Sequence, residues 1–197
     1  ARVQRFTSAG EPLDSWDGRG SPDGALARPT ALAVDGSDRV YVVDSLNSTV
    51  RVFDAEGAPL WSLGGFGDDP GQFADPIGIA VAPAGDLYVA DRFNGRVQRL
   101  TPRGEPVAQW TEGLRRPLAV TVTAEGSLVV VDGATRVVRQ YDADGHLLGS
   151  WGRAQLDRPE AVALDQAGRL IVADPGQGRL LAFRWGARSE AGGALVG

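Results

Sequence analysis

Asp86-Leu-Tyr-Val-Ala-Asp91 decides the fold of this 197-residue chain, because close copies of it recur along the sequence. The three copies are Arg39-Val-Tyr-Val-Val-Asp44, Ser127-Leu-Val-Val-Val-Asp132 and Arg169-Leu-Ile-Val-Ala-Asp174. The aspartates that close the four segments are 47, 41 and 42 residues apart. Between its polar or charged ends, each segment is a continuous apolar run, which is typical of a strand buried on both faces.

The sequence around each copy repeats in the same register. A proline-led segment precedes each copy, a further strand follows it, and in the first three units a fourth strand ends in tryptophan. The proline-led segments begin at Pro29, Pro76, Pro117 and Pro159, and the strands after the aspartates begin at Thr49, Arg96, Arg136 and Arg179. Arg2 to Trp16 match the last two strands of such a unit. Glycine turns separate the strands, as tight hairpins require. Each full unit is therefore four short strands, A to D in chain order.

Four-stranded antiparallel units that recur about every 40 to 50 residues are the signature of propeller blades. We therefore expect an all-β chain, a β-propeller, forming one domain over residues 1–197. Its parts would be a partial blade at 1–16, full blades at 29–61, 76–110 and 117–151, and a terminal blade at 159–197.

The number of strands does not fit a closed ring. The sum is 17, or 18 if Ala194-Leu-Val pairs as a last strand, whereas closed rings of four-stranded blades need multiples of four. We expect an open arc of about four and a half blades, with Arg2 to Trp16 as an isolated pair at one end. The alternative is a closed small ring with a displaced tail.

Composition limits the function classes. The formal charge of −5 and the pI near 4.9 have the wrong sign for broad nucleic-acid binding. No apolar run is long enough for a membrane helix, so membrane insertion is not expected. With no Cys and one His, we expect no metal site and no cofactor. The chain begins at Ala1 and has no Met, so we expect a segment of a longer protein, whose compartment stays open between cytoplasmic and extracellular or periplasmic.

One stretch carries a family resemblance. Gly64-Gly-Phe-Gly-Asp-Asp-Pro-Gly-Gln-Phe73, then Asp75-Pro-Ile-Gly-Ile-Ala-Val81 and the residues from Gly85 to Leu100 closely resemble an NHL repeat. Similarity to this family extends over nearly the whole chain and weakens after Phe183. It implies a propeller, commonly of six blades, and leaves the chemistry open, because NHL-type propellers include peptide, protein and RNA binders, sensor domains and a lyase. The third blade departs from the pattern, since it lacks the asparagine that Asn47 and Asn94 supply, and we expect a tighter turn there.

The topology predicts which face binds a ligand. The D to A and B to C connections share one face, and its two long loops, Asp17 to Arg28 and Ser62 to Asp75, follow one another on successive blades. Long loops on a rigid scaffold are where binding residues accumulate. The candidate ligand-binding residues are Phe66, Asp68, Asp69, Phe73, Arg92, Phe93, Arg115, Arg116 and Glu160. The alternative is that Phe66 and Phe73 pack beneath their own loop and that the charges are merely solvated.

Two acidic patterns have a structural interpretation. The aspartates Asp44, Asp91, Asp132 and Asp174 could converge on a metal, but we expect them to accept backbone N–H bonds and to pair with Arg96, Arg136 and Arg179. Asp142-Ala-Asp-Gly145 looks like the start of a calcium loop, but the later ligands are missing. His146 follows that turn, on the face opposite the long loops.

We therefore expect a non-catalytic module that binds or scaffolds a protein or peptide. The alternative is a propeller enzyme of lyase or lactonase type, with channel residues partly outside this segment. RNA binding is a weaker alternative, because it would need a basic face with stacking aromatics.

Overall fold

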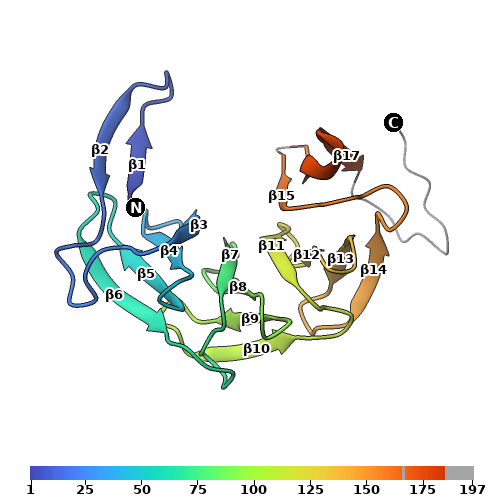
Figure 1. Ribbon diagram of the computed structural model, residues 1–197, viewed down its shortest axis with the longest axis horizontal. Coiled ribbons are helices and arrows are strands. Elements are labelled where there is room, and N and C mark those ends of the chain that lie inside the picture. The colour runs from blue at the N-terminus through green and yellow to red at the C-terminus, as the bar shows by residue number, and fades with distance from the viewer. Residues whose placement is uncertain (166, 185–197) are drawn as a thin grey trace.

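The computed structural model describes residues 1–165 and 167–184, which form five antiparallel sheets arranged as an open arc (Figure 1). At one end lies a pair, β1 (Val3–Phe6) and β2 (Pro12–Trp16). Three four-stranded sheets follow: β3 (Pro29–Val34), β4 (Val40–Asp44), β5 (Thr49–Phe53) and β6 (Pro59–Gly64); β7 (Pro76–Val81), β8 (Leu87–Asp91), β9 (Arg96–Leu100) and β10 (Pro106–Trp110); β11 (Pro117–Val122), β12 (Leu128–Asp132), β13 (Val137–Tyr141) and β14 (Leu147–Trp151). The last sheet holds β15 (Ala161–Leu164), β16 (Arg169–Asp174) and β17 (Arg179–Arg184), with a 3-10 turn η1 (Pro175–Gln177) before β17.

The strands pair in chain order within every sheet, as meandering hairpins do. In the second full blade, Val89 of β8 lies opposite Ile79 of β7 and Gln98 of β9. Among the described residues, β1 pairs with β2 and with no strand of the last sheet. The predicted propeller of four-stranded blades, open and with an isolated pair at one end, is thereby confirmed. The possible strand at Ala194-Leu-Val lies outside the described residues.

The hydrophobic core is divided among the interfaces between neighbouring blades. One cluster joins Tyr41 and Val43 of β4 to Leu87 and Val89 of β8, and further clusters join the later blades in the same way. In each of the three full blades the second strand is buried along its whole length. Burying each Val or Leu side chain contributes about 1.5–3 kcal/mol, so blade contacts supply most of the stabilisation.

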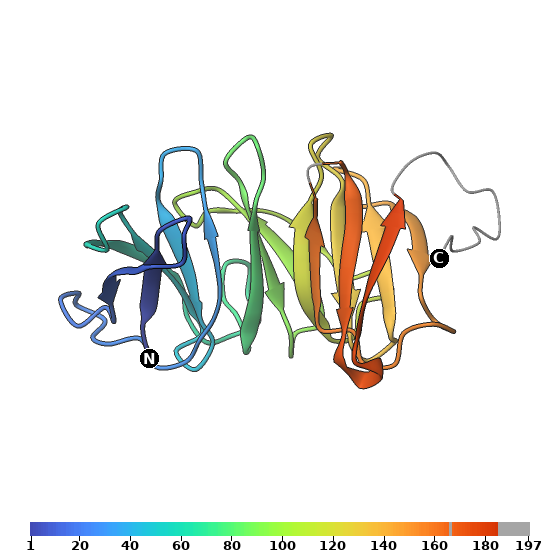
Figure 2. The ribbon, with the colours of Figure 1, turned by 90° about the horizontal axis from the view of Figure 1, so that it is seen from above.

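The two faces of the arc differ in their loops (Figure 2). The β3–β4 and β7–β8 turns lie on one side and η1 lies on the other, as the topology predicts. The long connections are residues 17–28, between β2 and β3, and residues 65–75, between β6 and β7. The predicted second loop began three residues too early, because Ser62, Leu63 and Gly64 continue β6 in register with β5. We call the side that carries both loops the long-loop face.

The turn between β12 and β13 corrects a prediction. Arg136 has a φ of 57° and occupies the same left-handed turn position as Gly95, so β13 begins one residue later, at Val137. Asp132 lies opposite Val137 just as Asp91 lies opposite Arg96. This turn is therefore not tighter than its counterparts, and it places a non-glycine residue where glycine is favoured.

None of the described segments forms a helix of the length and apolar character that crossing a bilayer requires.

Candidate functional site

The aspartates that close the second strand of each blade fasten the loops of the long-loop face. Asp91 accepts the N–H of Ala74 at 2.7 Å, and Asp44 accepts those of Ala27 and Arg28 at 2.9 and 2.7 Å. Asp132 and Asp174 bind the equivalent residues of their blades. These carboxylates accept backbone N–H bonds, as predicted, and the partners common to all four blades lie just before the inner-strand proline, about 17 residues upstream. That constant spacing in the sequence indicates which backbone N–H groups each aspartate accepts.

Pairing of aspartate with arginine follows the prediction in one of the three blades. Arg96 Nε lies 2.8 Å from Asp91 Oδ2. Arg136 lies 3.6 Å from Asp157 instead, because it sits in the turn rather than at the start of β13. Arg179 donates to the carbonyl of Gln155 at 2.6 Å. Among the described residues, the ion pair is therefore found in the second full blade and not at Arg136 or Arg179.

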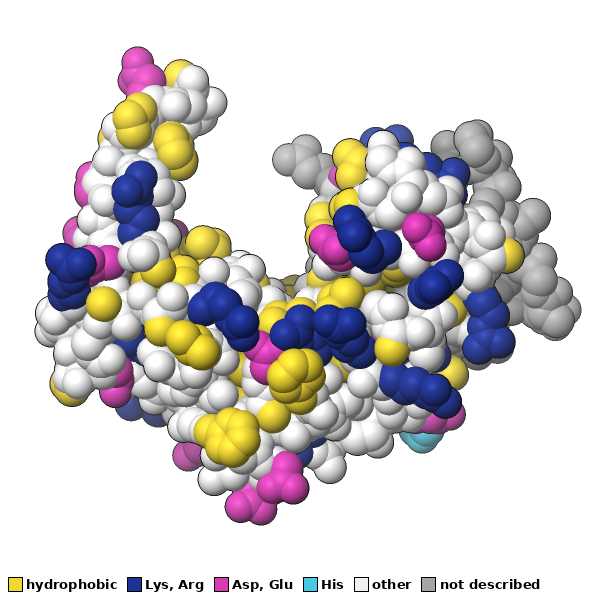
Figure 3. Space-filling view, viewed as in Figure 1, with side chains coloured by type: hydrophobic (Ala, Val, Ile, Leu, Met, Phe, Trp, Pro, Cys, Tyr) yellow, Lys and Arg dark blue, Asp and Glu magenta, His cyan; other side chains and the backbone are white. Residues whose placement is uncertain are grey.

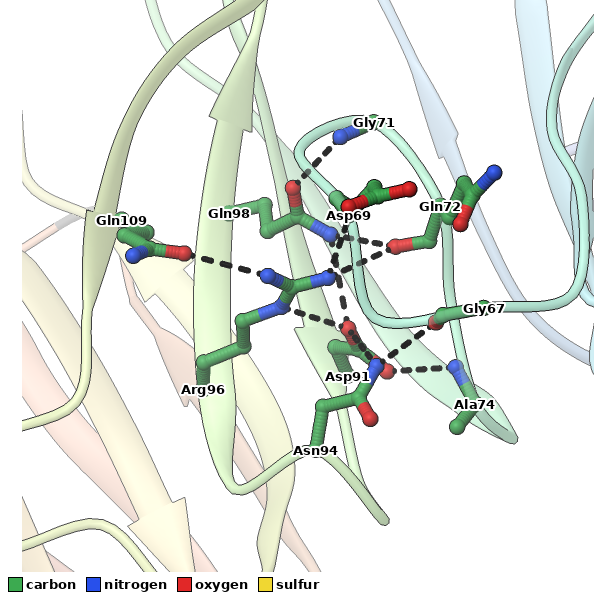
Figure 4. Close-up of polar contacts among 10 residues, drawn as sticks. All are labelled: Gly67, Asp69, Gly71, Gln72, Ala74, Asp91, Asn94, Arg96, Gln98 and Gln109. Atoms are coloured by element: carbon green, nitrogen blue, oxygen red, sulfur yellow. Dashed lines mark hydrogen bonds and ion pairs between the residues drawn. The ribbon is translucent and has the colours of Figure 1, made fainter.

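Side chains of β8, β9 and the turn between them form hydrogen bonds to the backbone of loop 65–75 (Figure 4). They are Asp91, Asn94, Arg96 and Gln98. Arg96 Nη2 donates to the carbonyls of Asp69 and Gln72, both at 3.0 Å. Gln98 donates to the carbonyl of Gln72 at 2.6 Å and accepts the N–H of Gly71 at 2.9 Å. Because buried side chains satisfy its backbone, this long loop presents its outward side chains from a fixed platform.

The two phenylalanines of this loop have opposite environments. Phe73 is fully buried in the core between the first two full blades, whereas 82% of Phe66 is exposed. Phe73 is therefore not a ligand contact, and its prediction is wrong. The ring of Phe73 packs so closely against Gly64 that a Cβ on this glycine would lie 2.5 Å from it. The alternative, packing beneath the loop, describes Phe73 and does not describe Phe66.

A second exposed aromatic lies on the adjoining turn. Phe93, between β8 and β9, is 69% exposed, and the guanidinium carbon of Arg92 lies 4.8 Å from its ring centroid. The N–H of Phe93 donates to the carbonyl of Ala74 at 3.0 Å, which ties this turn to the long loop. The structure thus places Phe66, Arg92 and Phe93 on adjoining, mutually fastened segments, with Asp68 and Asp69 exposed on the same loop.

Basic side chains gather along the inner border of this face (Figure 3). Asp75, whose side chain is only 7% exposed, forms ion pairs with both Arg28 and Arg92. Burial and the charges of Arg116 and Arg28 lower the pKa of Arg92. We call Arg28, Arg92 and Arg116 the arginine cluster. Asp75 was not among the predicted residues, although a signal exists: the residue before each inner-strand proline is charged in every blade, and only Asp75 is acidic.

The remaining predicted residues fall in two places. Arg115 and Arg116 are exposed, and their backbone N–H groups bind Asp132. Burial alone would raise the pKa of Asp132, but these bonds and those from Thr135 outweigh it and lower the pKa.

Glu160 belongs to the terminal sheet, where it pairs with Arg158 at 3.1 Å and lines a pocket at the open end of the arc. Glu160 is therefore apart from the other predicted residues.

The face opposite the long loops carries a compact polar group. Asp142, Asp144 and His146 bring their ligand atoms within 4.8 Å of one another. Asp142 accepts the N–H groups of Asp144 and His146 at 3.0 and 2.8 Å, and these bonds, that of His146 foremost, lower its pKa. Hydrogen bonding to Asp142 raises the pKa of His146. Asp54 and Asp165 make the same backbone bonds in other blades, so the arrangement is a repeated turn.

Comparisons with known proteins agree with the β-propeller fold. The family model described as NHL repeat matches residues 26–53 and 73–100. No curated protein matches significantly.

Similar solved structures include a protein of unknown function from Bacteroides caccae, with 15% identity, a TM-score of 0.70, and coverage of 95% of this chain and 66% of that one. Virginiamycin B lyase from Staphylococcus aureus with quinupristin has 14% identity and a TM-score of 0.72, with 93% and 59% coverage. Hydrazine synthase from Kuenenia stuttgartiensis has 14% identity and a TM-score of 0.61, with 82% and 51% coverage. At such identities the likeness shows the fold alone. The chain spans no more than two thirds of each of these chains.

Proposed function

This chain belongs to the NHL-repeat β-propellers, and we propose that its long-loop face is a non-catalytic surface that binds or scaffolds a protein or peptide. The observation that carries this proposal is the exposure of Phe66 and Phe93 on adjoining, mutually fastened segments. Exposed aromatic side chains are costly in water and are enriched at protein interfaces. A rigid platform lowers the entropy lost on binding.

The charges around the aromatic residues favour a polypeptide over a polyanion. Asp68 and Asp69 are exposed on the loop that carries Phe66, while Arg92 stacks on Phe93. A polypeptide presents groups of both signs, whereas an RNA backbone would be repelled by the two carboxylates. The mixed surface therefore supports peptide recognition.

The lyase or lactonase alternative has less support from the described residues. An acid–base role would need a titratable group beside the ligand. The chain's single histidine, His146, lies on the opposite face in a turn, and Glu160 pairs with Arg158.

Selection from a displayed library of random peptides tests the proposal. We expect the protein to enrich peptides that share an apolar residue, and Phe93→Ala to weaken their binding by about tenfold, the effect of losing one well-packed aromatic anchor. Leu148→Ala is the matched control, because Leu148 is also exposed but lies on the outermost strand of the third full blade. Circular dichroism would verify that both variants keep the fold.

Failure to enrich any peptide would contradict the proposal. So would enriched peptides whose binding is lost in Leu148→Ala and retained in both Phe66→Ala and Phe93→Ala.

A further inference from the structure

We propose that the arginine cluster is a subsite for a carboxylate, so that the polypeptide recognised by the long-loop face is acidic and carries an apolar residue beside the acid. This inference rests on the proposed peptide binding and adds the chemistry of the ligand. It concerns Arg28 before β3, Arg92 in the β8–β9 turn and Arg116 before β11; the charges of Arg28 and Arg116 both act on Arg92.

The cluster has more positive charge than its own carboxylate can compensate. The single acid Asp75 is shared by Arg28 and Arg92, which engage its two oxygens, and the charge of Arg116 also acts on Arg92. Arg116 has no carboxylate partner among the described residues. The Nε of Arg92 is also buried without an acceptor in the described part of the chain. An added negative charge would therefore be attracted by all three groups and would reduce their mutual repulsion.

The accessible parts of the cluster suit a carboxylate. Arg28 is half exposed, with its Nε bound to Ser45 Oγ at 2.7 Å, and its side chain is thereby oriented while part of the guanidinium stays open to solvent. Arg116 is exposed. Guanidinium groups bind carboxylates through paired N–H donors, which gives both orientation and strength. An oriented, undercompensated set of donors is what such a ligand needs.

The surroundings indicate an isolated acid in a peptide rather than a nucleic acid. Arg92 also contacts the ring of Phe93, so an apolar side chain next to the ligand's acid would meet that ring. Asp68 and Asp69 lie on the neighbouring loop, and the chain as a whole carries a formal charge of −5. A single carboxylate would be attracted to the arginine cluster without lying next to Asp68 and Asp69. A polyanion would extend past these acids and be repelled by them.

Two matched arrays of synthetic peptides test this inference. In the first, each short peptide carries a Phe and a Glu at varied spacing, and in the second every Glu is replaced by Gln. We expect the protein to bind the best Glu peptides about tenfold more tightly than their Gln counterparts. Arg116→Ala should remove most of that difference. Arg103→Ala is the control, because Arg103 is an exposed arginine in the β9–β10 turn, on the face opposite the long loops.

The outcomes separate this inference from the proposed function. Equal binding of the Glu and Gln arrays would leave peptide recognition standing and overturn the carboxylate subsite. Loss of the Glu preference in Arg103→Ala but not in Arg116→Ala would overturn it as well. Binding of neither array would contradict the proposed function itself. Binding of a single-stranded RNA oligomer in place of both arrays, with a steep salt dependence, would overturn both proposals.

Discussion

The second full blade and the terminal sheet contain nearly the same strand in different surroundings. Leu87-Tyr-Val-Ala-Asp91 of β8 is buried at every position, whereas Leu170-Ile-Val-Ala-Asp174 of β16 alternates between buried and partly exposed residues. The inner strands differ in the same way, because β15 is exposed at alternate positions. The same pattern of residues thus produces the same strand, while its burial depends on whether a blade lies on each side.

The cause of the difference is the number of neighbouring blades. Strands of the second blade contribute to the core clusters on both of its sides, whereas the described residues of the terminal sheet contribute to one cluster. Leu180 of β17, on the side without a neighbour, is 72% exposed. At the other end of the arc, Leu32 and Val34 of β3 are exposed beside the two-stranded sheet. The open ends carry the apolar residues that a complete interface between blades would bury.

Replacing equivalent arginines should give the largest difference between the two regions. Arg96→Ala leaves Asp91 buried without its cation and removes the support of loop 65–75, so we expect a loss of about 3–5 kcal/mol in the free energy of unfolding. Arg179→Ala removes one exposed hydrogen bond and should cost about 0.5 kcal/mol or less. Urea denaturation measures both, and equal losses would contradict the comparison.

Leucine truncation should give the next largest effect. Leu87 is fully buried between two blades, so Leu87→Ala should cost about 2–5 kcal/mol through lost burial and a residual cavity. Leu180→Ala should change stability by less than about 0.5 kcal/mol, because its side chain is mostly in water. A large loss for Leu180→Ala would show that a neighbour covers this edge in solution.

Adding a side chain at equivalent inner-strand positions should have a smaller effect. A Cβ on Gly78 would lie 2.8 Å from the carbonyl oxygen of Leu118 in the next blade, so Gly78→Ala should cost about 1–3 kcal/mol. Ala161 holds the equivalent position in the terminal sheet and is exposed. Ala161→Val should therefore be tolerated within about 0.5 kcal/mol. Thermal melts would compare the two, and tolerance of Gly78→Ala would show that the blades can separate.

The smallest effect that we expect is on the loss of stability at acidic pH. The pKa of Asp132 is lowered in the folded chain, so its stabilisation is complete above the ordinary aspartate pKa of about 3.9 and is lost as the pH falls through the lowered value. Asp165 in the terminal sheet also has a lowered pKa, mainly because of its backbone hydrogen bond from Arg169, but water screens it. The measurement is the urea midpoint of unfolding at mildly acidic and at strongly acidic pH. We expect Asp132→Asn to reduce the fall in this midpoint more than Asp165→Asn does. The reverse order would contradict this.

Much of the architecture could be predicted from the repeats because strand and turn preferences are local. Two of the predictions that failed did so because a contact that the sequence pattern does not record decided the outcome. Phe73 and Phe66 are both phenylalanines in a glycine-rich loop, and only packing against the neighbouring blades places one inside and one outside. Arg136 was assigned to a strand because it aligned with Arg96, whereas the pairing of Asp132 with Val137 places it in the turn.

The sequence by itself determined the four-stranded repeat and the order of its strands and predicted the open arc, because apolar runs, glycine turns and strand counts are properties of the chain. It also placed Phe66, Arg92 and Phe93 on one face, since topology alone sorts the loops. Only the tertiary structure decided that Asp75 joins Arg28 and Arg92 and that Glu160 lies apart. Asp75 and Arg28 are 47 residues apart, and the geometry of their contact depends on how one blade packs against the next, which no local pattern records.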